Sequence, residues 1–400
     1  MSIIPAIKFL LITAGLLILV YLFVLPLNTE KYFSPAETLN QTIPTAKQKQ
    51  LHQAYMSADM HGDTLLWSRD ISEPSDRGHA DISRLLAGNV ALQIFMAVVE
   101  APDDVISDSI EDKGDKIRSI AFWDRWPLDT LTSYKARALY QAEKLRITAK
   151  KSANSLFVIE SKQDLHDFLE QRKTNPESMS SILGIEGAHP TEWNLENVEA
   201  LFEAGFRSME LAHYTDTEYA GSSSGVTKYG ITPRGKKLVR LMNELGMIID
   251  VAHLSMQGVD EILEISSKPV YFSHGGVYKT CPKARNLTDE IIKKIADKKG
   301  IIGIGFFEGA ICDVSIQGIV MALRHVRDLV GAEHVGLGSG WDVSPLPIAP
   351  NQLALLSSAL RVDGFSDTEV AMIMGGNVIR FFSENLPNKH AATYPVAAIL

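Results

Sequence analysis

The chain has 400 residues, of which 46% are hydrophobic and 22% are charged, so it contains enough apolar material for a large folded core. This balance excludes a mainly disordered protein, which would combine low hydrophobicity with a high net charge. The 48 acidic and 39 basic residues give a net charge of −9, whereas a nucleic-acid binder usually has a basic surplus, so we expect no nucleic-acid partner.

An apolar stretch near the N-terminus predicts a membrane helix. Residues Phe9–Leu27 carry no charge and, together with Ile3–Ile7, are long enough as a helix to cross a hydrocarbon core about 30 Å thick. Lys8 would also suit a cleaved signal peptide, but no small-x-small cleavage site follows closely, which favours an uncleaved anchor over residues 1–27. Because Lys8 lies on the short N-terminal side, we expect a single-pass protein whose main body is extracytoplasmic or periplasmic. Residues 28–50 are polar, contain two prolines and predict a linker.

After residue 50, short apolar runs alternate with longer amphipathic stretches such as Pro233–Leu245. This alternation predicts parallel β/α units, and nine strand-like runs suit an α/β fold, a TIM-like (β/α)8 barrel with one extra strand. We expect the barrel to span residues 51–386, with a helical insertion around 100–155 and a peripheral tail at 387–400. The nine runs are Met56–Met60, Val90–Val99, Leu156–Glu160, Ile182–Ile185, Arg207–Leu211, Met247–Ala252, Pro269–Ser273, Ile301–Phe306 and His334–Gly338.

Histidines and carboxylates follow several of these runs at the point where each strand ends. One such histidine is ordinarily structural, but an ordered set is harder to explain in that way. In a barrel the carboxyl ends of all strands open on the same mouth, so we expect these side chains to meet there. The set consists of His61, Asp63, Glu186, His213, His253 and His274.

His61 and Asp63 are two residues apart, so in a strand their side chains face the same way. Imidazole and carboxylate donors together suit zinc, or another borderline divalent metal, better than calcium or magnesium. Adding Glu186, His253 and His274 gives five ligands, more than one tetrahedral zinc uses. Two zinc ions that share Glu186, one held by His61 and Asp63 and the other by the two remaining histidines, would use all five.

The chain resembles the membrane (renal-type) dipeptidases, the M19 metallopeptidase family of the amidohydrolase-like barrels. The resemblance is carried, in family order, by DMHGDTLLW at 59–67, GIEGAHP at 184–190, ELAHYTDTEYAGSS at 210–223, DVAHLS at 250–255, PVYFSHGG at 269–276, ARNLTDE at 284–290, HVGLGSGWD at 334–342 and GGNVIRFF at 375–382. It implies a metal-dependent hydrolase of small dipeptides, in which a hydroxide that bridges two zinc ions attacks the peptide bond, and it leans towards a homodimer.

The resemblance also assigns roles to single residues. It implies zinc ligation by the five residues above, with Glu186 bridging. It further implies that His213 polarises the scissile carbonyl or stabilises the tetrahedral oxyanion. Arg285 would hold the substrate carboxylate, for which a planar guanidinium is well shaped.

One position departs from the family pattern. The eighth-strand motif normally reads GSDFDG or close to it, with the first aspartate as proton carrier, but here Gly340 takes the place of that aspartate. The second aspartate is present as Asp342, which we keep as the remaining candidate catalytic carboxylate. Loss of a general acid or base typically lowers the rate by about 10²–10⁴-fold, so turnover is expected to be impaired.

Two alternatives therefore stay open. Gly340 suggests a catalytically weak, metal-containing peptide-binding protein, and an amidohydrolase of N-acyl amino acids or lactams would use the same metal site. The sequence fixes neither substrate preference nor oligomeric state. It also leaves open whether the two cysteines, Cys281 and Cys312, form a disulfide.

Overall fold

The computed structural model describes residues 4–23, 29–34, 36–105 and 108–388. Within them, nine parallel strands form one sheet in the order β2-β1-β9-β8-β7-β6-β5-β4-β3, and an additional β2–β4 pairing closes it. The strands are β1 Ser57–Gly62, β2 Val90–Val98, β3 Leu156–Val158, β4 Met179–Glu186, β5 Phe206–Glu210, β6 Ile248–Asp250, β7 Tyr271–Gly275, β8 Ile301–Ile304 and β9 Val335–Leu337.

Strand β3 is the one that stands outside the closed ring. It pairs only with the first residues of β4, from Met179 to Ser181, whereas β5 pairs with the same strand from Leu183 onward. Strand β2 pairs with β4 along Ser180–Glu186. Removing β3 leaves eight strands in the ring, so the predicted TIM-like barrel with one extra strand is confirmed.

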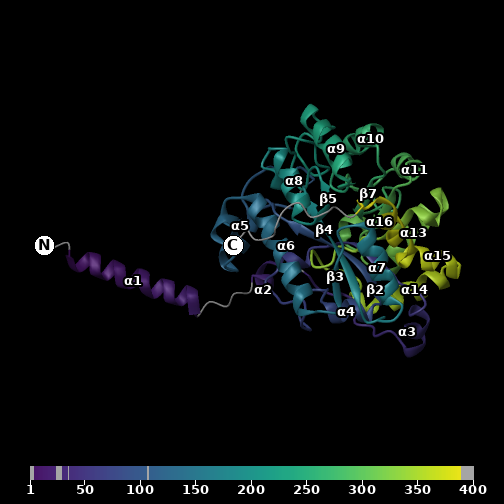
Figure 1. Ribbon diagram of the computed structural model, residues 1–400, viewed down its shortest axis with the longest axis horizontal. Coiled ribbons are helices and arrows are strands. Elements are labelled where there is room, and N and C mark those ends of the chain that lie inside the picture. The colour runs from purple at the N-terminus through teal and green to yellow at the C-terminus, as the bar shows by residue number, and fades with distance from the viewer. Residues whose placement is uncertain (1–3, 24–28, 35, 106–107, 389–400) are drawn as a thin grey trace.

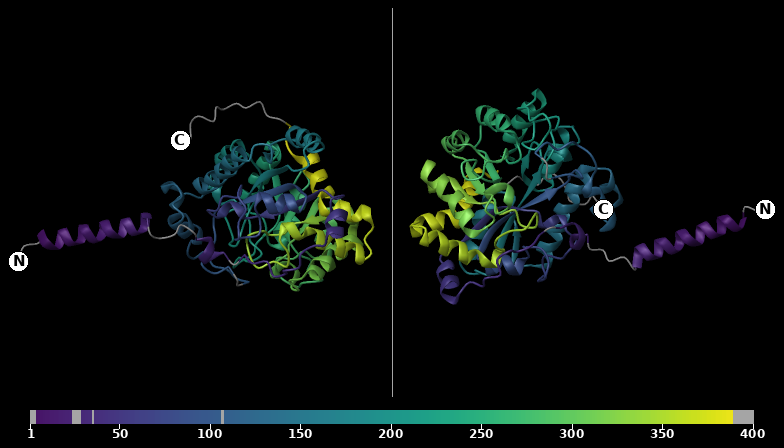
Figure 2. Two further views of the ribbon diagram at one scale, coloured as in Figure 1. Left: turned by 90° about the horizontal axis from the view of Figure 1, so that it is seen from below. Right: turned by 180° about the vertical axis from the view of Figure 1, so that it is seen from behind.

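Helices surround the barrel, as Figures 1 and 2 show. Helix α9 illustrates why they form: Thr232 caps its first turn by accepting a hydrogen bond from the Gly235 amide, and Leu238 and Met242 bury its apolar face. The helices are α1 Ile4–Phe23, α2 Glu30–Phe33, α3 Ala46–His52, α4 Ile82–Ala87, α5 Lys116–Trp123, α6 Tyr134–Lys151, α7 Lys162–Arg172, α8 Glu196–Glu203, α9 Pro233–Leu245, α10 Met256–Ile265, α11 Asp289–Asp297, α12 Glu308–Ile311, α13 Ile316–Val330, α14 Leu353–Val362, α15 Asp367–Ala371 and α16 Asn377–Asn385.

Helices α5 and α6 lie in the segment 100–155, for which an insertion was predicted. Arg137 of α6 is buried and donates to both carboxylate oxygens of Asp115, at 2.9 and 2.7 Å. The same guanidinium donates to the carbonyl of Val99 at 2.7 Å, directly after strand β2. These contacts fix the segment to the end of the barrel where the strand-end residues lie.

The N-terminal prediction requires correction. Helix α1 ends at Phe23, and residues 24–27 of the predicted apolar span lie outside the described residues. Among the helices that the structure describes, none has the length and apolar content needed to cross a lipid bilayer, so the predicted single-pass anchoring is wrong. The hydroxyl of Tyr21 in α1 donates to the carbonyl of Phe122 at 2.6 Å. Of the predicted tail, residues 389–400 also lie outside the described part.

The segment predicted as a linker contacts the barrel domain. The Leu39 amide donates to the carbonyl of Leu346 at 2.8 Å, and the Gln352 side chain donates to the carbonyl of Asn40 at 2.7 Å. Helix α3 begins within this segment at Ala46.

Cys281 and Cys312 are joined by a disulfide across a sequence separation of 31 residues. In the chain-entropy model, a crosslink over a loop of this length stabilises the folded state by about 3–4 kcal/mol. We therefore expect the Cys281→Ser, Cys312→Ser double variant to lose about that much unfolding free energy in urea titrations. A loss no larger than a few tenths of a kcal/mol would contradict the prediction.

Candidate active site

The predicted metal ligands converge at the carboxyl ends of the strands. Two groups of potential ligands form there, and in each group one donor atom from every residue lies within 4.8 Å of the others. The first group is His61, Asp63 and Glu186, and the second is Glu186, Glu210, His253 and His274. Glu186, the last residue of β4, belongs to both groups.

One carboxylate oxygen of Glu186 lies close to three of the histidines. Its Oε1 lies 3.2 Å from Nε2 of His61, 3.7 Å from Nε2 of His253 and 3.8 Å from Nε2 of His274. Asp63 Oδ1 is also 3.2 Å from Nε2 of His61. The five predicted metal ligands therefore gather around Glu186, and all five are buried.

The second group contains two closely spaced imidazoles. Nε2 of His253 lies 2.9 Å from Nε2 of His274, and Nδ1 of His274 is 2.8 Å from the hydroxyl of Ser273. Burial, reinforced by the positive charge of Arg285 and neighbouring histidines, lowers the pKa of both imidazoles well below its usual value. Both rings are therefore neutral at physiological pH, the form in which histidine binds a metal ion.

The first group concentrates negative charge around one imidazole. Burial alone would lower the pKa of His61, but Asp63 and Glu186 raise it to about 10. Burial and the nearby Asp63 carboxylate raise the pKa of Glu186 to about 7. The Asp63 and Glu186 carboxylates thus favour a positive charge at this position, either a proton on His61 or a metal ion that displaces that proton.

His213 faces the opposite edge of the same carboxylate. Its Nε2 lies 3.2 Å from Oε2 of Glu186, and its Nδ1 lies 3.1 Å from the carbonyl oxygen of Glu100. Burial lowers its pKa well below the usual value, so the ring is neutral. His213 thus borders the two groups without belonging to either.

Arg285 lies at the rim of the cluster. Its guanidinium donates to the carbonyl of His274 at 3.4 Å and sits 4.8 Å above the ring centroid of Phe307. Its Nε has no hydrogen-bond partner among the described residues. A cation with a free donor therefore stands next to the predicted ligands.

Glu210 is a site residue that the sequence reasoning missed. It is the last residue of β5, is fully buried, and joins the second group. Burial, with added repulsion from Asp250 and Glu186, raises its pKa well above the usual value. The available signal was a carboxylate at the end of an apolar strand run, three residues before His213.

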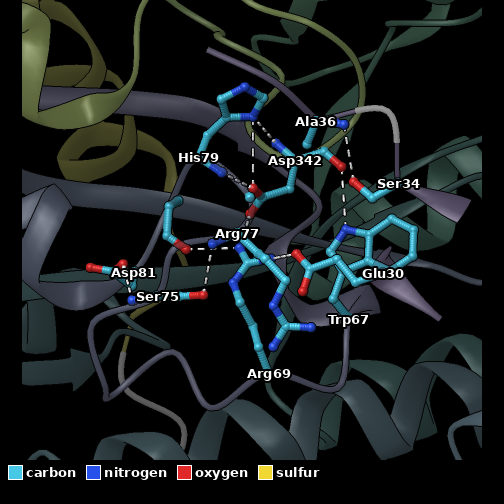
Figure 3. A network of polar contacts seen from close by, with 12 residues as sticks. Glu30, Ser34, Ala36, Trp67, Arg69, Ser75, Arg77, His79, Asp81 and Asp342 are labelled. Carbon is cyan, nitrogen blue, oxygen red and sulfur yellow. Dashed lines mark hydrogen bonds and ion pairs between the residues drawn. The ribbon is translucent and has the colours of Figure 1, made fainter. Parts of the chain in front are cut away.

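Asp342 lies elsewhere, in the polar network of Figure 3. Its carboxylate is paired with the Arg69 guanidinium and accepts a hydrogen bond from the His79 amide, and Arg69 is also paired with Glu30. The indole of Trp67 donates to the Asp342 carbonyl at 3.2 Å. The structure therefore groups Asp342 with an arginine that neutralises it, and Asp342 is in neither of the two ligand groups.

This network predicts a stability that depends on pH. Burial opposes the ionised form of Asp342, but Arg69 and His79 hold its pKa below the ordinary value, so its contribution is present at neutral pH and is lost as the pH falls below about 4. We expect Asp342→Asn to lower the unfolding free energy by about 3 kcal/mol at pH 7, and by less at pH 3.

Urea titrations at the two pH values would measure this difference. Asp76→Asn is the matched control, because its carboxylate is exposed and lies 3.8 Å from Arg77, where an ion pair contributes under about 1 kcal/mol. Equal losses in the two variants would contradict a buried ion pair at Asp342.

Gly340 stands beside the ligand cluster. Its amide donates to the carbonyl of His61 at 3.2 Å, and its φ of +77° lies in the left-handed region that glycine favours. A Cβ added there would meet Cδ1 of Phe307 at 3.0 Å. Gly340 is thus next to the cluster and brings no side chain to it.

The chain is similar to a known family and to several named dipeptidases. The family model described as membrane dipeptidase (peptidase family M19) matches residues 45–394. Dipeptidase tcpJ of Claviceps purpurea is 27% identical over 77% of this chain and 69% of its own length. An uncharacterized dipeptidase of Schizosaccharomyces pombe is 26% identical over 80% and 76% respectively.

Solved structures agree on the fold. A metallopeptidase from Rhodobacter sphaeroides, liganded with a phosphinate mimic of the dipeptide L-Ala-D-Ala, superimposes with a TM-score of 0.69 at 21% identity, covering 83% of this chain and 99% of that one. The probable dipeptidase PvdM from Pseudomonas aeruginosa gives 0.68 at 17% identity, over 85% and 98%. Together with the family match over most of its length, these findings show that the chain belongs to the membrane dipeptidases of peptidase family M19, a family of metal-dependent hydrolases.

Proposed function

We propose that the chain is a binuclear zinc dipeptidase whose turnover is limited by the glycine at position 340. The observation that carries the proposal is the double membership of Glu186, which supplies a donor atom to both ligand groups. One carboxylate shared by two groups of ligands is the arrangement that a pair of metal ions requires.

The spacing of the donor atoms fits zinc. Zinc bonds of about 2.0–2.1 Å in tetrahedral geometry place neighbouring ligand atoms about 3.3 Å apart. The distances from Oε1 of Glu186 to the ring nitrogens of His61, His253 and His274 are 3.2, 3.7 and 3.8 Å. Imidazole nitrogens are ligands that zinc accepts readily, whereas calcium and magnesium sites are built from oxygen ligands, so the three histidines favour zinc.

Each residue then has a task. His61 and Asp63 would hold one ion, His253 and His274 the other, and Glu186 both. When bound, a zinc pair supplies Lewis-acid polarisation of the peptide carbonyl and an activated water molecule for hydrolysis. The remaining steps depend on the protein's own side chains.

Those side chains bind and orient the dipeptide. Arg285 would bind its C-terminal carboxylate through the free donor of the guanidinium. His213 is buried beside Glu186 with its Nδ1 next to the Glu100 carbonyl, and it would stabilise the charge that develops on the substrate's carbonyl oxygen through a proton on Nε2. Asp342, the other catalytic candidate from the sequence, is paired with Arg69 and belongs to neither ligand group. We therefore assign it a structural role in that ion pair and not proton transfer to the substrate.

Gly340 supports a second candidate function. Without a carboxylate at that position the chain would bind metal and peptide but cleave slowly, as expected for a peptide-binding pseudoenzyme. An amidohydrolase of N-acyl amino acids or lactams would share the metal site and differ only in the substrate. The homodimer implied by the family resemblance stays a prediction, which light scattering would test.

One experiment separates these functions. We expect the zinc-replete protein to contain two zinc ions per chain by elemental analysis, and to hydrolyse L-L or L-D dipeptides at a measurable rate that a chelator abolishes. Fewer than one zinc per chain would overturn the proposal. Peptide binding by calorimetry without cleavage would favour the pseudoenzyme, and cleavage of N-acyl amino acids alone would favour the amidohydrolase.

A further inference from the structure

We infer that Glu210 is a sixth protein ligand of the metal centre, so that His253, His274, Glu186 and Glu210 form a closed four-ligand site. The inference rests on the proposed function, and it makes the two metal positions unequal. The position of His61 and Asp63 would keep three protein ligands, counting Glu186, and one open coordination place.

The first argument is geometric. One carboxylate oxygen of Glu210 lies within 4.8 Å of a donor atom from each of Glu186, His253 and His274. Four donors from four different strand ends therefore lie close together, two of them imidazole nitrogens and two carboxylate oxygens. This number and these donor types match a tetrahedral zinc site.

The second argument is the state of the Glu210 side chain itself. The residue is fully buried, and neither carboxylate oxygen has a hydrogen-bond partner among the described residues. Within that part of the chain, no lysine or arginine lies close enough to form an ion pair with it. Its nearest register partner is Asp250 on β6, another buried acid.

Burying a carboxylate without a hydrogen-bond or ion-pair partner costs free energy. A protein that keeps one therefore points to a ligand that pairs with it. A cation held by His253 and His274 would satisfy Glu210 where the protein's own groups do not. Glu210 thus differs from Asp250, whose Oδ1 already accepts hydrogen bonds from the amides of Ala252 and Ser273.

The inference has a functional consequence. Zinc sites with four protein ligands are typically structural, whereas catalytic sites have three protein ligands and keep one position for water or substrate. The ion at the four-ligand site would therefore bind more tightly and anchor Glu186. The open place, and with it the substrate carbonyl, belongs to the side of His61 and Asp63.

Zinc titration of Glu210→Gln against a chromophoric chelator tests the inference. We expect the unaltered protein to bind two zinc ions with different affinities, and the variant to lose at least about 100-fold at the tighter site, since even outer partners of metal ligands contribute about 10–100-fold. Asp250→Asn is the matched control, because it removes a neighbouring buried carboxylate that belongs to neither ligand group, and we expect it to leave the tighter affinity within about threefold.

Thermal melts exclude misfolding as the cause. Without zinc, Glu210→Gln should melt at the same temperature as the unaltered protein or above it, because it no longer buries an unpaired carboxylate, while its stabilisation by zinc should shrink. Equal zinc affinities in Glu210→Gln and the unaltered protein would overturn the inference and leave the proposed function standing. An equal loss in Asp250→Asn would also overturn it, since charge alone would then explain the effect. No zinc bound by the unaltered protein would instead refute the proposed function.

Discussion

Replacing Glu186 by glutamine is expected to remove zinc from both positions and to lower dipeptide hydrolysis by more than about 10³-fold. The reason is that Glu186 is the one residue common to both ligand groups. Its Oε2 also lies 3.2 Å from His213, so the substitution disturbs the proposed oxyanion partner as well. Elemental analysis and steady-state rates on the same preparation measure the two effects together.

Glu100→Gln provides the matched control. Glu100 is a buried glutamate in the same region, burial and the nearby Asp112 raise its pKa to about 8, and it belongs to neither ligand group. Its side chain lies 3.9 Å from Nε2 of His189, whereas only its backbone carbonyl contacts His213. We expect this variant to keep both zinc ions and most of the activity. Retention of two zinc ions by Glu186→Gln would contradict a shared ligand.

The barrel was predictable because its strands are buried on both faces. Such strands appear in the sequence as continuous apolar runs, and each of the nine predicted runs overlaps a strand in the structure. The ends of the strands were predicted less accurately. The predicted run Met247–Ala252, for example, extends beyond the strand Ile248–Asp250 on both sides. The N-terminal apolar stretch produced an error, because hydropathy there indicated a bilayer anchor that the described helices do not support.

The candidate site was predictable where its residues follow strand ends. His253 and His274 are 21 residues apart, yet the parallel topology places their ring nitrogens 2.9 Å from each other. Glu210 was missed because, although it begins the quoted motif at 210–223, a single carboxylate at the end of an apolar strand gives no sign of its own that it faces the metal ligands. Its role becomes visible only from its burial and from the donors around it.

The sequence could predict neither the contacts of the Asp342 side chain nor the Cys281–Cys312 disulfide, because both depend on residues that are distant in the chain. Asp342 is neutralised by Arg69, which lies 273 positions away in the sequence and is paired in turn with Glu30. The separation of 31 residues between Cys281 and Cys312 is compatible with many distances, and only the packing of their two loops brings them together. Contacts of this kind depend on the whole fold and leave no local periodicity.

If Gly340 limits turnover, as proposed, introducing a carboxylate at that position should raise activity. We expect Gly340→Asp to raise kcat/KM for a dipeptide by about 10²–10⁴-fold, the usual contribution of a positioned general acid or base. The backbone has a φ of +77°, which aspartate tolerates better than most residues, and Phe307 must shift by a few tenths of an ångström because the new Cβ would lie 3.0 Å from its ring. We therefore also expect a stability cost of about 1–3 kcal/mol.

Gly340→Asn separates proton transfer from these steric effects. Asparagine has nearly the same size and the same tolerance of a left-handed backbone, so it should lose the same stability, yet it has no titratable group. Parallel measurements of kcat/KM against pH should give an added pH-dependent limb in Gly340→Asp and none in Gly340→Asn. If both variants are equally inactive while they keep two zinc ions, the absence of a carboxylate at position 340 is not what limits the rate of hydrolysis. The proton carrier would then be one of the buried acids around Glu186.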